Sequence, residues 1–220
     1  MTTFVDAALS LILLYAVIQF FVLYRKQGSQ LLLWYSLGSL LYLFTSLNWI
    51  VTDFGLISTG IIENANPFGW TRVIGISFLL VALGIENWLD RPQMLRFPYI
   101  FTLMPLLLII SFFFVFETAY LNEIILGIYE GGALLVAVLL FGFFMSRDGK
   151  YLIPVAGVST LLLAVVVYWF PGDVVTANSW IWKLIIIIGA GTFTYGYQRL
   201  IMLNQSSGND YSEHAVEANS

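Results

Sequence analysis

Glu130 is the ionisable residue that lies deepest within a long apolar stretch of this sequence, and it is flanked by small residues. Helical spacing places it on a stripe with Glu123, Gly127, Gly131 and Leu134, and a carboxyl group in membrane hydrocarbon is costly. One interpretation is a close-packing glycine seam across which protonated Glu130 forms a hydrogen bond. The other is a proton-accepting or ligand-binding carboxylate, because small neighbours leave room for a guest.

Lys183 is the second residue with potential chemistry, about two turns into another apolar stretch. Its side chain could extend to the outer membrane interface, as lysines near helix ends do. Alternatively it forms an ion pair with Glu117, Glu123 or Glu130, which would neutralise a costly charge on both sides. Depth along the helices favours Glu123 as that partner.

Arg72 and Glu86 lie near opposite ends of a further apolar stretch, on nearly the same helical face and about 21 Å apart. They are too far apart to touch. Arg72 is interpreted most simply as an interface anchor and Glu86 as part of the inner helix end, with a ligand-binding or relay role as the alternative for each.

Tyr42 belongs to a semipolar stripe at steps of three and four residues through another apolar stretch. Such hydroxyls act either as hydrogen-bonding glue between helices or as the lining of a pocket. The stripe consists of Tyr35, Ser39, Tyr42, Ser46, Trp49 and Asp53.

The elements that must position these residues are membrane helices. The 220 residues are 60% hydrophobic and only 10% charged, whereas a soluble domain is about 25% charged. A spanning helix needs roughly 20 apolar residues, and these runs are too long and continuous for barrel strands. We therefore predict an all-α bundle of about seven transmembrane helices, at residues 4–24, 30–52, 69–89, 98–117, 120–145, 151–170 and 177–202.

Basic residues fix the predicted orientation. Successive helix ends alternate between the two sides of the membrane. Most of the basic residues then lie on one side, and the opposite side holds only Arg72 and Lys183. The positive-inside rule makes the richer side cytoplasmic, so the N-terminus is predicted outside and the C-terminus in the cytoplasm of the cell membrane. The basic side consists of Arg25, Lys26, Arg91, Arg96, Arg147, Lys150 and Arg199.

Composition also excludes several kinds of site. The chain contains no cysteine, and its one histidine, His214, lies in the polar C-terminal segment. Thiolate catalysis, iron–sulfur ligation and histidine-ligated haem are therefore excluded, and no cofactor or metal site is expected. The acidic balance gives nucleic acid no basic surface. We expect one transmembrane domain, 1–203, followed by a disordered cytoplasmic tail, 204–220.

Two resemblances follow from this pattern. Seven helices with an outside N-terminus resemble microbial rhodopsins in topology only, because residues 187–192 contain no lysine for retinal. The pattern Arg25-Lys26-Gln27-Gly28 to Trp34, together with Trp70-Thr71-Arg72, resembles the seven-helix sensor regions of some histidine kinases. That resemblance implies a sensing role, and because no kinase follows Arg199 we expect a separate partner protein.

The sequence contains no catalytic constellation, so an enzyme is the least favoured class. We predict a non-enzymatic, sensor-like or scaffold module that binds a lipid, a small apolar ligand or a partner membrane protein. The alternative is a small carrier or proton-coupled transporter that uses Glu130, with Glu123, Lys183 or Glu86 as relays. Expected partners are the lipid bilayer and a membrane protein, which includes a second copy of this chain.

Overall fold

The computed structural model describes residues 2–53, 67–90, 107, 110, 119–169 and 180–217. In these ranges the chain forms helices and no strand. They are α1 (Thr2–Gln27), α2 (Gln30–Asp53), α4 (Pro67–Asp90), α6 (Ala119–Arg147), the 3-10 turn η2 (Gly149–Tyr151), α7 (Leu152–Trp169) and α9 (Trp180–Glu217). The predicted all-helical class is therefore confirmed for the described part of the chain.

Six of the predicted helices correspond to the six long helices described. The predicted helix at 98–117 lies outside the described residues except for Leu107 and Ile110, which are helical. The difference is at the C-terminus, where α9 continues to Glu217 although the sequence predicts a disordered tail from residue 204. No proline follows Pro171, so every residue of this polar segment can supply the backbone donor that a helix requires.

Four described helical segments are long and apolar enough to cross a membrane: Thr3–Gln27, Gln30–Val51, Gly127–Arg147 and Gly149–Tyr168. Their outward faces carry large exposed apolar side chains, such as Phe4, Leu11, Ile128 and Leu139. A water-soluble protein rarely exposes so much contiguous apolar surface, whereas lipid solvates it. The exposed residues therefore support the membrane assignment.

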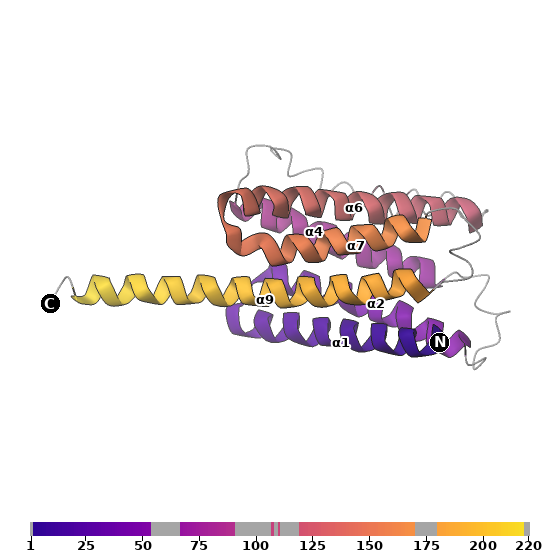
Figure 1. Cartoon of the computed structure of the whole chain (residues 1–220), viewed down its shortest axis with the longest axis horizontal. Coiled ribbons are helices and arrows are strands. Elements are labelled where there is room, and N and C mark those ends of the chain that lie inside the picture. Colours follow the sequence, from indigo (N-terminus) through magenta and orange to yellow (C-terminus); the bar gives the residue numbers. More distant parts are fainter. Residues whose placement is uncertain are drawn as a thin grey trace.

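The six long helices form a closed ring. The chain packs α1 against α2, α2 against α4, α4 against α6, α6 against α7, α7 against α9, and α9 back against α1. Figure 1 shows the helices aligned, with the N-terminus at one end of the bundle and α9 extending beyond the other end. This ring leaves a central space that all six helices can line.

Three glycines bring α7 and α9 into close contact. A Cβ atom on Gly157 of α7 would lie 2.4 Å from the backbone nitrogen of Phe193, and one on Gly189 of α9 would lie 2.9 Å from the backbone nitrogen of Leu161. A Cβ on Gly196 would similarly meet Ile153 and Pro154. Only glycine allows this approach, as at other close helix interfaces in membranes.

The two short connections at the end opposite the N-terminus have clear local causes. Gly28 adopts φ 67° and its N–H donates to the carbonyl of Tyr24 at 2.7 Å, which ends α1 in the left-handed conformation that glycine favours. Asp148 accepts the backbone N–H of Lys150 and forms an ion pair with its Nζ at 2.8 Å. The hydrogen bond from Lys150 lowers the pKa of Asp148 below its usual value.

Candidate ligand-binding cavity

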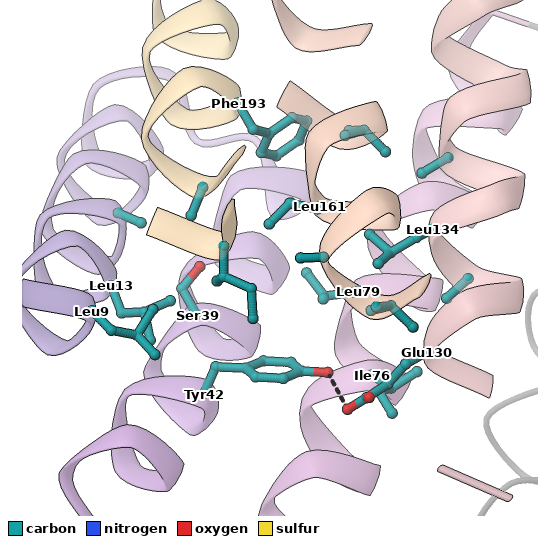
Figure 2. Close-up of a pocket in the computed structure, with 18 of the residues that line it drawn as sticks. Leu9, Leu13, Ser39, Tyr42, Ile76, Leu79, Glu130, Leu134, Leu161 and Phe193 are labelled. Carbon is teal, nitrogen blue, oxygen red and sulfur yellow. Dashed lines mark hydrogen bonds between the residues drawn. The ribbon is translucent and has the colours of Figure 1, made fainter. Parts of the chain in front are cut away.

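A cavity of about 440 Å³ occupies the centre of the ring, and residues from all six long helices line it. This volume lies within the range of small-molecule sites in proteins. Most of the lining is aliphatic or aromatic, as Figure 2 shows for Leu9, Leu13, Leu79, Leu134 and Leu161. The polar residues gather toward the end of the bundle that holds the N-terminus. We call this group the polar end of the cavity: Tyr42, Ser46, Trp49, Arg72, Glu130 and Lys183.

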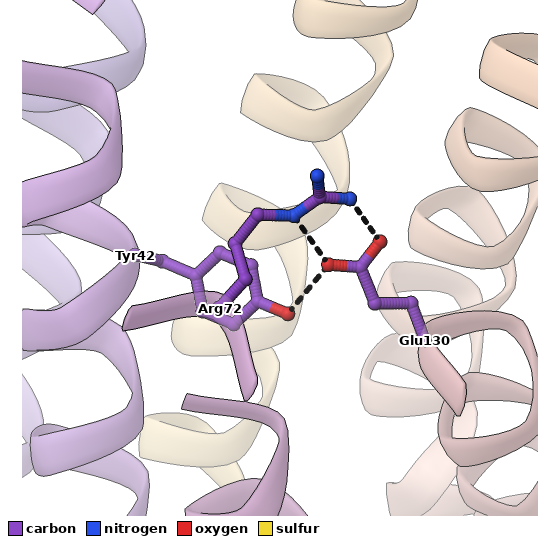
Figure 3. A network of polar contacts seen from close by, with 3 residues as sticks. All are labelled: Tyr42, Arg72 and Glu130. Atoms are coloured by element: carbon purple, nitrogen blue, oxygen red, sulfur yellow. Dashed lines mark hydrogen bonds and ion pairs between the residues drawn. The ribbon is translucent and has the colours of Figure 1, made fainter. Parts of the chain in front are cut away.

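Arg72 and Glu130 form a two-point ion pair at the polar end (Figure 3). Arg72 Nε donates to Glu130 Oε1 at 3.0 Å, and Nη2 donates to Oε2 at 2.8 Å. The Tyr42 hydroxyl donates to Oε1 at 3.2 Å, so three helices meet at one carboxylate. Such fork-like contacts are among the strongest charged hydrogen bonds in proteins. The interpretation of Arg72 as an interface anchor is therefore wrong, because its guanidinium turns inward to α6.

Lys183 is also paired, but with a residue that the sequence did not single out. Its Nζ lies 2.6 Å from Oδ1 of Asp6 on α1, and Asp6 is fully buried. The same ammonium lies 4.9 Å from the ring centre of Trp49 and 5.6 Å from that of Trp182, within cation–π range. Lys183 therefore turns inward to α1 rather than outward to the outer interface, and its described partner is Asp6; the side chain of Glu123, the predicted partner, is outside the described residues. The physical reason is that α9 packs directly against α1, which places Asp6 beside Lys183.

The semipolar stripe of α2 acts both as glue and as lining. Ser46 forms a 2.8 Å hydrogen bond with Ser10 of α1, and the Tyr42 hydroxyl donates to Glu130 of α6 at 3.2 Å. Tyr35, Ser39, Tyr42, Ser46 and Trp49 all line the cavity. The two alternatives left open by the sequence are thus not exclusive, because a helix in a ring packs on its neighbours and faces the centre at once.

An aromatic cluster lies toward the opposite end of the cavity. It consists of Phe20, Tyr35, Phe141, Phe193 and Tyr197, from four helices. Ring centres lie 5.4 Å apart for Phe20 and Tyr35, 5.6 Å for Tyr35 and Phe193, and 5.7 Å for Phe141 and Phe193. These separations are typical of favourable aromatic pairs. Four of the five rings also line the cavity, which gives it one aromatic and one polar end.

Gly131 and Gly132, next to Glu130, make no close contact with the helices that the structure describes. Among the described residues, a Cβ on Gly131 would meet only Val165, at an ordinary 3.8 Å, and one on Gly132 would meet nothing within 4 Å. Glu130 borders the cavity. The predicted Gly127–Gly131 seam stays a prediction, because most of the chain from 91 to 118 lies outside the described residues. Glu123 and Glu86 lie on the helical backbone of α6 and α4, but their side chains are outside the described residues.

No cluster of three or more potential metal ligands occurs in the part of the chain that the structure describes. No family model, curated protein or solved structure matches the chain. The resemblance to histidine-kinase sensor regions therefore stays a prediction. The arrangement of charges, hydroxyls and apolar side chains around the cavity is the basis for any functional proposal.

Asp6 is the main site residue that sequence reasoning missed. The signal was present, because Asp6 is an acidic residue near the start of the first apolar stretch, and Lys183 lies near the same end of the last one. Proximity between the first and last helices closes the ring, and spacing along one helix cannot reveal it. Phe193 was missed for a similar reason, since its role depends on the approach of α9 to α7 at Gly157.

Proposed function

We propose that this chain is a multi-pass protein of the cell membrane, with seven spanning helices, an outside N-terminus and a cytoplasmic C-terminus. Arg25 and Lys26 in the last turn of α1, together with Arg147 and Lys150 at the α6–α7 connection, support this orientation. All four lie at the end of the bundle opposite the N-terminus. The seventh span in the proposal is the segment 98–117.

The proposed activity is binding of a small, mostly apolar ligand inside the bundle, with a sensor-like or scaffold role. The observation that carries this proposal is the central 440 Å³ cavity, whose lining is largely apolar and includes a few polar groups at one end. Ligand sites commonly combine an apolar wall with a small number of orienting polar groups. A bound ligand would contact all six long helices and could therefore bias their arrangement.

Signalling in this proposal requires a partner membrane protein or a second copy of the chain. Helix α9 supports a path to such a partner, because it lines the cavity at Lys183 and Thr194 and extends beyond the bundle at its C-terminal end (Figure 1). A change in cavity occupancy would act directly on that helix. The partner would be found at the cytoplasmic end.

Proton-coupled transport through Glu130 is the less favoured alternative. Arg72 engages both carboxylate oxygens of Glu130 and Tyr42 donates to one of them. Both carboxylate oxygens are therefore already occupied by hydrogen bonds from other side chains. The ion pair therefore favours a structural or positioning role at the polar end.

The ligand proposal is tested by identifying small molecules that co-purify with the protein from its membrane. We expect organic extraction followed by mass spectrometry to show an enriched apolar compound in the native protein and its loss in Ala133→Leu, which fills the cavity. Ala133 is buried and lines the cavity, whereas Ala156 is exposed on α7 and does not. Ala156→Leu is thus the matched control, and equal extracts from both variants would contradict the proposal.

A further inference from the structure

Two hydroxyl groups in the middle of the cavity have no hydrogen-bond partner among the residues that the structure describes. Ser39 of α2 lines the cavity and its hydroxyl points inward in Figure 2. Thr194 of α9 lines the same cavity and is only 2% exposed. A hydroxyl that faces a largely apolar cavity can be satisfied by a polar group of a guest, and a polar group without a partner in apolar surroundings costs free energy. The pair therefore points to a guest that supplies the missing partner.

The two hydroxyls lie at a similar depth on different helices. The contact of Lys183 with Trp49 marks a common level for α2 and α9. Ser39 precedes Trp49 by about 15 Å of helix, and Thr194 follows Lys183 by about 16 Å of helix. Both hydroxyls therefore lie deeper in the bundle than the polar end. They are close to the aromatic cluster, because Tyr35 and Phe193, whose rings are in contact, lie within about one helical turn of Ser39 and Thr194.

The charges at the polar end disfavour an anionic guest. Arg72 is paired with Glu130, and Lys183 is paired with Asp6. These four residues carry no net charge, and a carboxylate or phosphate guest would have to displace a carboxylate that is already in place. Burying a further unpaired anion would be costly.

We propose that the ligand is an uncharged, mostly apolar molecule with one hydroxyl or carbonyl group, which Ser39 and Thr194 bind by hydrogen bonds. This inference rests on the proposed function and names its ligand class. The cavity volume of about 440 Å³ is typical of small-molecule sites and limits the size of the molecule. Its apolar body contacts the aliphatic wall, and one end contacts the aromatic cluster.

Three probes of one carbon skeleton test this inference: farnesene, farnesol and farnesoate, which differ in carrying no polar group, a hydroxyl or a carboxylate. Binding to the full chain in detergent micelles is measured by native mass spectrometry. We expect farnesol to bind about three- to tenfold more tightly than farnesene, as one or two net hydrogen bonds would give. Farnesoate is expected to bind more weakly than farnesol.

The variant Ser39→Ala/Thr194→Val should bring farnesol to the affinity of farnesene and leave farnesene unchanged. Ser146→Ala/Thr160→Val is the matched control, because both hydroxyls donate to carbonyls of their own helix and neither residue lines the cavity. Ala133→Leu should weaken all three probes.

Each remaining outcome separates this inference from the proposed function. Tightest binding of farnesoate, or a farnesol preference that survives Ser39→Ala/Thr194→Val, overturns the inference about the hydroxyl pair. If farnesol and farnesene bind equally and Ala133→Leu weakens both, the inference about the hydroxyl pair is also overturned, but a ligand-binding cavity is supported. Binding that Ala133→Leu does not change, or no binding of any probe, overturns the proposed function as well.

Discussion

The guanidinium of Arg72 reaches from α4 to α6 and holds both carboxylate oxygens of Glu130, at 3.0 and 2.8 Å. The exposed fractions of the two side chains are 14% and 10%, so this pair is largely shielded from solvent. The chain that connects α4 to α6, 91–118, includes the predicted helix 98–117. A strong polar link at this point fixes two walls of the cavity relative to each other.

Removal of either member of this ion pair is expected to destabilise the bundle. Glu130→Ala should lower the free energy of unfolding by about 3 kcal/mol, because it leaves a shielded guanidinium without its counter-charge. Arg72→Met/Glu130→Met should recover most of that loss. Reversible unfolding in mixed detergent micelles measures both, and a double variant as unstable as the sum of the singles would contradict the assignment.

The pair of Lys183 with Asp6 should behave differently from an exposed pair of the same types. Lys183→Met leaves a fully buried carboxylate behind and should cost about 3 kcal/mol of stability. Lys150→Met is the control, since its pair with Asp148 is 28% and 47% exposed and should contribute little to stability. Similar losses in the two variants, measured by thermal unfolding, would show that Lys183 is not shielded as described.

The glycine contact between α7 and α9 gives a steric prediction. Gly157→Ala should destabilise by about 2–3 kcal/mol, because the new Cβ would lie 2.4 Å from the backbone of Phe193 and force the helices apart. A Cβ in Gly142→Ala meets none of the described residues within 4 Å, so this variant should be neutral or stabilising by up to about 1 kcal/mol. The same unfolding assay compares them, and an unchanged Gly157→Ala protein would rule out the close approach.

The proposed orientation can be tested without background labelling, because the chain contains no cysteine. A membrane-impermeant maleimide should label Thr3→Cys in intact cells and Ser146→Cys only after the membrane is opened. Thr3 lies at the end of the bundle that holds the N-terminus, and Ser146 lies at the opposite end. Labelling of Ser146→Cys in intact cells, with Thr3→Cys protected, would reverse the orientation.

Local sequence patterns were sufficient for the helices. Continuous apolar runs and basic or glycine-containing breaks predicted six of the described helices, because membrane hydrocarbon forces the backbone to satisfy its hydrogen bonds within each segment. The helical period also placed the α2 stripe on one face, and five of its residues line the cavity. These features depend only on residues close together in the chain.

Partner choice depended on the tertiary structure. Glu130 was recognised from sequence as a costly residue, but its partner Arg72 belongs to another helix and had been interpreted as an anchor. Lys183 was likewise recognised, while Asp6 became relevant only because α9 closes the ring against α1. The sequence determined which charges needed a partner, because burial makes them expensive. Only the order of helices around the ring decided which residues met, since helical spacing carries no information about neighbouring helices.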